Sequence, residues 1–400
     1  MKDILIIVHF TMVPGEAGNA RFKYISDKID KKDANVEIIT TAFSHLKKMH
    51  RKVSDEQRNS VTYKLTMIDE PGYTKNVSLK RFYSHYKIGK NLKKYLDKRE
   101  KPDLIYCAVP SLDVAKAAAE YAEKNDVRFI IDVQDLWPEA FKMAFNIPIL
   151  SDMMFYPMKR QADYIYRQAD GIVAVSQTYA DRALKSNTKC SSARSVYLGT
   201  DLGSFDKLAR DNKFMHKPED EIWLAYIGSL ADSYDLISVM DALKILEDKK
   251  INNIKFIIMG DGIHKLKFEE YAKEKDVYSE FCGVLPYEDM VGMLTVCDIA
   301  VNPIKKGSAG SIINKVGDYA AAGLPVINTQ ESIEYRNLID EYGAGLNCVN
   351  GDPRDLADKL IKLMEDRKLR EKMGENNRRL AEERFDRDKT YKSIIDLIHS

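Results

Sequence analysis

The sequence predicts an α/β protein with two Rossmann-like domains, each built on a doubly wound parallel sheet. Strands of β-branched and aliphatic residues alternate with amphipathic helical segments, and this alternation occurs twice along the chain. The length of 400 residues suits two or three domains, and the 44% of hydrophobic residues can fill their cores. Because ligands of such sheets bind past the carboxyl ends of the strands, the turns that follow the strands are the candidate site.

The first half opens on a continuous apolar strand at residues 2–10. Further strands are expected at 36–41, 104–107, 129–133, 169–176 and 194–199, with helices at 113–124 and 177–185. The polar, charged segment 206–221 is predicted to connect the two halves.

The second half repeats the pattern. Its strands are expected to begin near Trp223, Ile254, Cys297 and Val326. Its helices are expected at 236–246, 286–296, 314–322 and 355–364, and a last amphipathic helix at 388–398. These elements predict domains at 1–205 and 206–385, followed by a C-terminal helix within 386–400.

Composition excludes several classes of protein. Five cysteines without a paired spacing indicate neither a zinc site nor a disulfide framework. The apolar run at the start is too short for a signal peptide, and no run approaches the length of a membrane span. We therefore expect a cytoplasmic protein with reduced thiols.

Charge is concentrated in residues 41–101. This segment holds 16 Lys and Arg against 6 Asp and Glu, whereas the whole chain carries only +1. Aromatic and aliphatic residues interleave with the cations, which suits a peripheral contact with a membrane that bears anionic lipids. A solvated basic face is the alternative. No nucleic-acid-reading motif accompanies the charge, so nucleic acid is not an expected partner.

The segment 308–329 is the most informative stretch. Glycines and short polar residues around Ser311 predict a loop, a helix is expected from Asn314, and Gly323 is suited to end it. Lys315 and Asp318 lie about one helical turn apart, so both can face one ligand. A helix start and a lysine suit phosphate, and a carboxylate suits sugar hydroxyls. Amphipathic core packing is the alternative explanation.

Residues 314–327 resemble the donor-binding segment of retaining GT-B glycosyltransferases of family 4, particularly the bacterial capsule, exopolysaccharide and O-antigen enzymes. That family carries a Glu-x7-Glu pair here. Asp318 matches the second acidic position, which implies a bond to the ribose of a nucleotide. The first position falls on Gly310, so the usual contact to the donor sugar is unassigned. In the GT-B fold the last helix crosses back to the N-terminal domain, which the resemblance implies for 386–400.

A second resemblance lies in Asp135-Leu-Trp-Pro-Glu139, which follows the strand at 129–133. In the same subgroup this string lies in the cleft that faces the donor. The resemblance therefore implies that Asp135, and with less support Glu139, act together with Lys315 as catalytic residues that position or polarise reactants. A structural cap on a helix that begins near Pro138 is the alternative.

Glycine-containing loops supply the remaining candidates. Gly15 and Gly18 have neither the dinucleotide fingerprint nor a P-loop spacing, but they suit close approach of a ligand. Family 4 commonly places an arginine and a lysine on the donor diphosphate where this chain has Ser229 and Tyr234, so Lys315 is the expected replacement. The other donor-binding candidates are Gly228, Ser229, Tyr234, Gly260, Gly262, Val284, Leu285, Ser311 and Asn314.

The resemblance implies a metal-independent retaining glycosyltransferase without a cofactor. The expected donor is a nucleotide sugar, most simply a UDP-sugar, and the expected acceptor is a saccharide or a polyprenyl-pyrophosphate-linked saccharide in surface polysaccharide synthesis. Two alternatives stay open because of the departures at Gly310 and Ser229. One is a catalytically silent nucleotide-sugar-binding partner subunit, and the other is a GT-B-type nucleotide-sugar epimerase.

Overall fold

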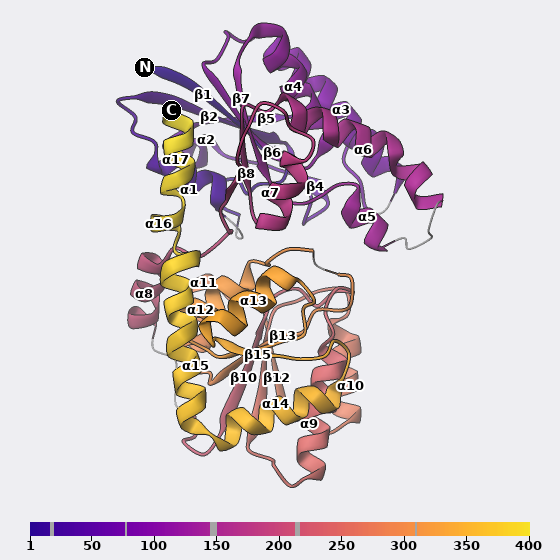
Figure 1. Cartoon of the computed structure of the whole chain (residues 1–400), viewed down its shortest axis with the longest axis vertical. Helices are drawn as coiled ribbons and strands as arrows, with labels where there is room; N and C mark the ends of the chain where they lie inside the picture. The colour runs from indigo at the N-terminus through magenta and orange to yellow at the C-terminus, as the bar shows by residue number, and fades with distance from the viewer. Residues whose placement is uncertain (17–19, 77, 145–149, 213–216, 309) are drawn as a thin grey trace. The chain divides into compact units, whose positions relative to one another are not determined.

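The computed structural model describes residues 1–16, 20–76, 78–144, 150–212, 217–308 and 310–400 (Figure 1). The chain forms two compact units. Unit 1 consists of Met1–Val196 and Tyr391–Ser400, and unit 2 is the continuous segment Tyr197–Thr390. The sequence placed these divisions at 205 and 386. Each unit carries its own parallel sheet.

The sheet of unit 1 has seven parallel strands in the order β5-β2-β1-β6-β7-β8-β9. Ile4 at its centre pairs with Val36 on one side and Leu104 on the other. The strands are β1 (Lys2–Ile7), β2 (Ala34–Thr41), β5 (Lys64–Ile68), β6 (Leu104–Val109), β7 (Arg128–Val133), β8 (Gly171–Ala174) and β9 (Arg194–Ser195). A small antiparallel pair, β3 (Phe43–Ser44) and β4 (Met49–His50), follows β2.

Helices cover both faces of this sheet (Figure 1). Ile4 and Ile6 pack with Phe22 of α1 and with Ile394 and Ile398 of the last helix. The helices of unit 1 are α1 (Arg21–Lys28), α2 (Asp55–Asn59), α3 (Leu79–Leu96), α4 (Leu112–Asn125), α5 (Glu139–Ala144), α6 (Leu150–Gln168), α7 (Gln177–Leu184) and α17 (Lys392–His399). Residues from both ends of the chain therefore share one core.

The sheet of unit 2 has six parallel strands in the order β12-β11-β10-β13-β14-β15. They are β10 (Ile222–Ile227), β11 (Ile254–Met259), β12 (Ser279–Gly283), β13 (Ile299–Asn302), β14 (Val326–Asn328) and β15 (Gly345–Asn347). Alternate residues of β10 face opposite sides. Ala225 and Ile227 belong to one buried cluster, and Leu224 and Tyr226 belong to the other.

Each face of the unit 2 sheet has its own set of helices. The first cluster includes residues of α8 (Leu202–Asp211), α11 (Tyr287–Leu294), α12 (Lys315–Ala321), α13 (Ile333–Tyr342), α15 (Arg367–Leu380) and the π-helical turn η1 (Ala381–Phe385). The second includes residues of α9 (Leu236–Asp248), α10 (Lys265–Glu274) and α14 (Pro353–Glu365). The short α16 (Arg387–Thr390) ends the unit.

The prediction that 206–221 is a connection was wrong for its first part. Helix α8 runs from Leu202 to Asp211, and Asp201 caps its start by accepting a hydrogen bond from the Ser204 amide at 3.0 Å. Leu202 and Phe205 anchor the helix in the unit 2 core. The predicted helix at 314–322 is also shorter in the structure, where α12 spans Lys315–Ala321.

Candidate functional site

Four loops lie around the start of α12 at the carboxyl edge of the unit 2 sheet. The loop after β10 is joined to the loop after β13 by hydrogen bonds from the Asp235 amide to the Pro303 carbonyl at 2.9 Å and from the Lys305 amide to the Ser233 carbonyl at 3.0 Å. The loop after β11 is joined to the loop after β12, since the Gly260 amide donates to the Gly283 carbonyl at 2.7 Å. This edge is where doubly wound sheets bind ligands.

Lys315 is the buried cation of this edge. Its Nζ lies 3.9 Å from the ring centre of Tyr226 and 4.0 Å from that of Tyr234. Among the described residues the nitrogen has no hydrogen-bond partner. Burial lowers the pKa of the Lys315 amine well below its ordinary value. The two rings hold the amine by cation–π attraction, which leaves its N–H groups available to an anion.

Glycines allow the loops to approach Lys315 and one another. A Cβ on Gly228 would lie 2.7 Å from Lys315 Nζ, and a Cβ on Gly260 would lie 1.8 Å from the Gly228 carbonyl oxygen. A Cβ on Gly262 would lie 2.4 Å from the Leu230 carbonyl oxygen. Ser229 has an exposed side chain, and its carbonyl accepts a hydrogen bond from the Tyr226 hydroxyl at 2.6 Å. The predicted residues Gly228, Tyr234 and Lys315 are therefore brought together.

Asp318 lies further along α12 and has different partners. Its Oδ1 accepts hydrogen bonds from Thr200 Oγ1 at 2.9 Å and from the Tyr287 hydroxyl at 3.0 Å. Burial raises the pKa of the Asp318 carboxyl, and these two bonds oppose the rise. Both bonds use the same oxygen, so Oδ2 can accept a hydroxyl. Sequence analysis missed Thr200 and Tyr287 as its partners.

The remaining predicted residues of unit 2 lie on loops around these two side chains. Val284 and Leu285 follow β12 and precede Tyr287, which binds Asp318. Their backbone amides donate no hydrogen bond to another backbone group among the described residues. The Ser311 carbonyl accepts a hydrogen bond from Gln330 Nε2 at 2.6 Å, which fixes the loop before α12. Asn314 occupies the N-cap position of α12 and is exposed.

Asp135 and Glu139 lie in unit 1, after β7, and both have protein partners. Asp135 accepts hydrogen bonds from Trp137 Nε1 at 3.1 Å and from the Tyr179 hydroxyl at 3.3 Å. Burial raises the pKa of Asp135, and the bonds from Leu136, Trp137 and Tyr179 oppose the rise. Glu139 begins α5 and forms an ion pair with Arg182 at 2.6 Å. These contacts are what a structural role requires.

The loop after β1 contains two predicted site residues, Gly15 and Gly18. Gly15 has a φ of +89°, and a Cβ there would lie 2.5 Å from Gln57 Nε2. Its conformation favours glycine, whereas the Gln57 amide is the far end of a flexible side chain that can move aside. Gly18 lies outside the described residues.

Unit 1 contains a buried polar group that sequence analysis did not identify. His9 Nδ1 is hydrogen-bonded to Ser111 Oγ at 2.6 Å, and His9 Nε2 to Glu70 Oε1 at 2.9 Å. Thr41 and Ser84 also donate to Glu70. Burial alone would raise the pKa of Glu70, but these hydrogen bonds outweigh it and lower the pKa to about 2. The signal in the sequence was a polar residue just after each of three strands.

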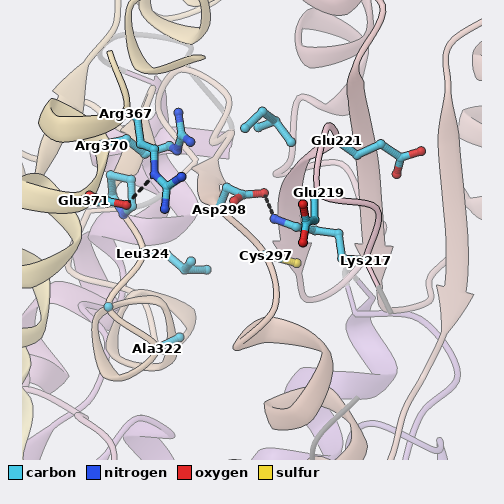
Figure 2. A pocket seen from close by; sticks show the side chains of 13 residues that line it. Lys217, Glu219, Glu221, Cys297, Asp298, Ala322, Leu324, Arg367, Arg370 and Glu371 are labelled. Atoms are coloured by element: carbon cyan, nitrogen blue, oxygen red, sulfur yellow. Dashed lines mark hydrogen bonds and ion pairs between the residues drawn. The ribbon is translucent and has the colours of Figure 1, made fainter. Parts of the chain in front are cut away.

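A cavity of about 610 Å³ lies at the opposite edge of the unit 2 sheet, beside Ile222, Asp298 and Pro325 (Figure 2). Its cations already have partners, and Arg370 donates to the Leu363 carbonyl at 2.6 Å. Lys217 binds Asp298 at 2.5 Å, and Arg367 binds Glu371 at 2.7 Å. None of the described residues that line it is a predicted site residue, so this cavity is separate from the candidate site.

Within the described ranges, no group of three or more His, Cys, Asp or Glu side chains could hold a metal ion. The helices of these ranges include none with the length and apolar character that a bilayer span requires.

Known proteins are similar to the part of the chain that forms this edge. Residues 209–380 match the family model described as glycosyl transferases group 1. The chain is 22% identical over 238 residues to the uncharacterized glycosyltransferase MJ1069 of Methanocaldococcus jannaschii, covering 58% of the chain and 59% of that protein. It therefore spans less than two thirds of that relative's length. It is 23% identical over 299 residues to the capsular polysaccharide biosynthesis glycosyltransferase CapM of Staphylococcus aureus, covering 72% and 74%.

Among solved structures, the chain is similar to Anabaena Alr3699/HepE in complex with UDP. The TM-score is 0.71 at 14% sequence identity, and the match covers 100% of both chains. The whole chain thus has the two-domain GT-B fold, and residues 209–380 are similar to the glycosyl transferases of group 1.

Proposed function

We propose that this protein is a retaining, metal-independent glycosyltransferase that moves a sugar from a UDP-sugar to a hydroxyl of a saccharide or lipid-linked saccharide in surface polysaccharide synthesis. The observation that carries the proposal is the Lys315 amine, buried beside Gly228 with no hydrogen-bond partner among the described residues. A buried amine without a partner is costly, and an anionic ligand would supply one. The UDP bound by HepE and the polysaccharide role of CapM support the donor and the pathway class.

Lys315 and Asp318 have separate roles in this proposal. Lys315 binds the donor diphosphate and stabilises the negative charge that develops on it when the bond to the sugar breaks. Asp318 accepts a hydroxyl of the ribose through Oδ2. The backbone of Val284 and Leu285 contacts the base, and Gly228, Gly260 and Gly262 leave room for the diphosphate. Retention of configuration and independence of metal follow from the family resemblance.

Asp135 is the proposed positioning residue of unit 1. It lies past the carboxyl end of β7, and burial raises its pKa. Its bonds to Trp137 and Tyr179 fix its orientation. Glu139 supports the same loop through Arg182. An oriented carboxyl at this edge suits a sugar hydroxyl.

Helix α3 supports a peripheral contact with an anionic membrane, where a lipid-linked acceptor would be presented. Its exposed apolar side chains include Leu79, Tyr83 and Tyr86, which are 87%, 53% and 48% exposed. Lysines lie beside them, with Lys87 Nζ 5.5 Å from the Tyr83 ring and Lys90 Nζ 5.0 Å from the Tyr86 ring. Aromatic rings with adjacent cations suit the interface of an anionic bilayer.

The test begins with a thermal-shift screen of nucleotide sugars against the full chain. The stabilising donor is then used, radiolabelled, in a transfer assay with lipid-linked acceptors. We expect turnover in the wild type and its loss in Lys315→Ala and Asp318→Ala. Turnover that survives both substitutions would overturn the site. Donor binding without turnover would favour the silent partner subunit, and conversion of the donor sugar without an acceptor would favour the epimerase.

A further inference from the structure

Unit 1 contains a group of basic side chains that the proposed donor site does not use. We call His45, Lys48, Arg81 and His85 the basic cluster. They come from the segment after β2 and from the first turns of α3. Phe10, Tyr73 and Trp137 form aromatic walls around them.

Contacts within the basic cluster are close. His45 Nδ1 is hydrogen-bonded to the Tyr73 hydroxyl at 2.5 Å, and Lys48 Nζ lies 3.5 Å from the same nitrogen. The Arg81 guanidinium lies 5.0 Å from the Trp137 ring centre, and His85 stacks on the Trp137 ring at 5.8 Å with an interplanar angle of 9°. Arg81 and His85 therefore both contact the Trp137 ring.

Two nitrogen atoms of the basic cluster have no hydrogen-bond partner among the described residues. They are His85 Nε2, on a side chain only 2% exposed, and Arg81 Nε. Buried nitrogens of this kind are rare because each loses its hydration without a replacement. Arg81 itself is only partly buried, which leaves it within reach of a ligand from solvent.

The carboxylates that interact with Arg81 are already engaged. Glu70 is bound by His9, Thr41 and Ser84, and Asp135 by Trp137 and Tyr179. Burial, together with repulsion from the other cations, lowers the pKa of His85 to about 2 and that of His45 to about 4. Burial lowers the pKa values of Lys48 and Arg81 as well. The two imidazoles are therefore neutral near pH 7, and Lys48 and Arg81 carry the positive charge of the basic cluster.

We infer that the basic cluster binds a phosphate or pyrophosphate ester, with Arg81 and His85 donating to its oxygens. Charge-assisted bonds from a guanidinium and an imidazole N–H to phosphate oxygens are strong, and an anion that reached the buried Nε of Arg81 or Nε2 of His85 would supply the partner that each nitrogen lacks. The exposed aromatic residues Phe82, Tyr83 and Tyr86 lie on the same helix as Arg81 and His85. A lipid-borne ester would thus meet apolar and basic groups on one element. The identification of this ester as part of the acceptor rests on the proposed function.

The test uses the full chain and inorganic pyrophosphate, titrated by calorimetry. Lys315→Ala removes the cation of the proposed donor site, so the binding that survives this change is the signal of interest. In that background we expect Arg81→Gln and His85→Gln each to weaken pyrophosphate binding about tenfold, as loss of one charge-assisted bond predicts. Lys80→Ala is the matched control, because it removes an exposed cation from the adjacent position of α3. We expect it to change the affinity less than about twofold.

Two further arms make the outcome decisive. If farnesyl pyrophosphate binds more tightly than pyrophosphate and with the same dependence on Arg81, the ester belongs to a lipid. If the two affinities are equal, the ester belongs to a soluble phosphate compound. Equal weakening by Arg81→Gln and Lys80→Ala would overturn the site. If Arg81→Gln does not fold, histidine NMR of the wild type replaces it, since a bound anion must raise the pKa of His85. If the protein does not bind UDP but still binds pyrophosphate, the proposed donor site is wrong and the phosphate site of the basic cluster stands.

Discussion

Lys315 is held between two tyrosine rings, and this placement has an energetic cost in the ligand-free protein. The Tyr226 and Tyr234 rings replace water around the amine, but they supply no hydrogen-bond acceptor at its Nζ among the described residues. An unsatisfied buried donor costs about 1–3 kcal/mol. Function at this position is therefore expected to oppose stability.

We predict that Lys315→Met raises the free energy of unfolding by about 1–3 kcal/mol while it abolishes UDP binding. Because the pKa of Lys315 is lowered in the folded state, the unfolded chain binds more protons between that lowered pKa and the ordinary value. Wild-type stability should therefore rise with pH in this window, and the variant should lose that slope. Urea unfolding at several pH values measures both effects. The exposed Lys306→Met is the control, and equal behaviour of the two variants would contradict the prediction.

Gly260 tests how tightly the loops of the site are packed. Gly260→Ala should cost about 3 kcal/mol or more, because its Cβ would lie 1.8 Å from the Gly228 carbonyl oxygen and the backbone would have to move. Gly351→Ala is the matched control, with a φ of +72° but nothing within 4 Å of the added Cβ. Its cost should be only the backbone strain of about 1 kcal/mol. Thermal unfolding compares them, and similar losses would show that space at Gly260 is not limiting.

The residue pairs that complete the site could not be predicted from the sequence. Lys315 and Asp318 stood out because they are neighbours on one helix. Asp318, however, takes its hydrogen bond from Thr200, 118 positions away, and His9 meets Glu70 and Ser111 at separations of 61 and 102. Contacts across such separations depend on strand order, which local pattern does not determine. The assigned roles of the site residues remain predictions.

At the scale of elements, prediction was accurate where burial alone determines the pattern. Strands β7 and β11 are rich in buried apolar residues, and the structure has them at Arg128–Val133 and Ile254–Met259, close to the predicted ranges. Helix α8 was missed because it buries only Leu202 and Phe205 and presents polar residues elsewhere. A helix with so narrow an apolar face resembles a linker in composition.

Helix α3 is the element whose exposed face can be tested as a membrane contact. We predict that the combined change Phe82→Ser, Tyr83→Ser and Tyr86→Ser weakens co-sedimentation with anionic vesicles about tenfold or more, because the aromatic area that enters the interface is lost. The control is Leu266→Ser on α10, an apolar residue that is 72% exposed in unit 2. Binding should also fall as salt rises. Salt-independent binding, or an equal effect of the control, would exclude this surface.

At the scale of the whole molecule, the alternation of strands and helices was enough to predict two parallel sheets, and the GT-B fold is confirmed. The boundary was harder to place. The structure divides the chain after Val196, and the last residues, from Tyr391, return to unit 1. Polar composition marks exposed segments, but only the packing of Phe205 in the unit 2 core shows to which unit α8 belongs.

The return of the chain to unit 1 can be tested by truncation. Removing residues 391–400 should destabilise unit 1 by about 6 kcal/mol, since the buried side chains of Tyr391, Ile394 and Ile398 each contribute about 2 kcal/mol. Hydrogen exchange of the strands β1 and β6 reports the loss. Removal of Ser400 alone is the control and should leave the exchange unchanged. Unaltered exchange after the longer truncation would show that α17 is dispensable for the core.

The same return has a consequence for how the protein is made. Unit 2 is one continuous segment, so all of its residues have been synthesised by Thr390. Unit 1 begins first but lacks Tyr391, Ile394 and Ile398 until unit 2 has been synthesised. Unit 1 is therefore completed only after unit 2, and its apolar face beneath α17 lacks this cover while unit 2 is being synthesised.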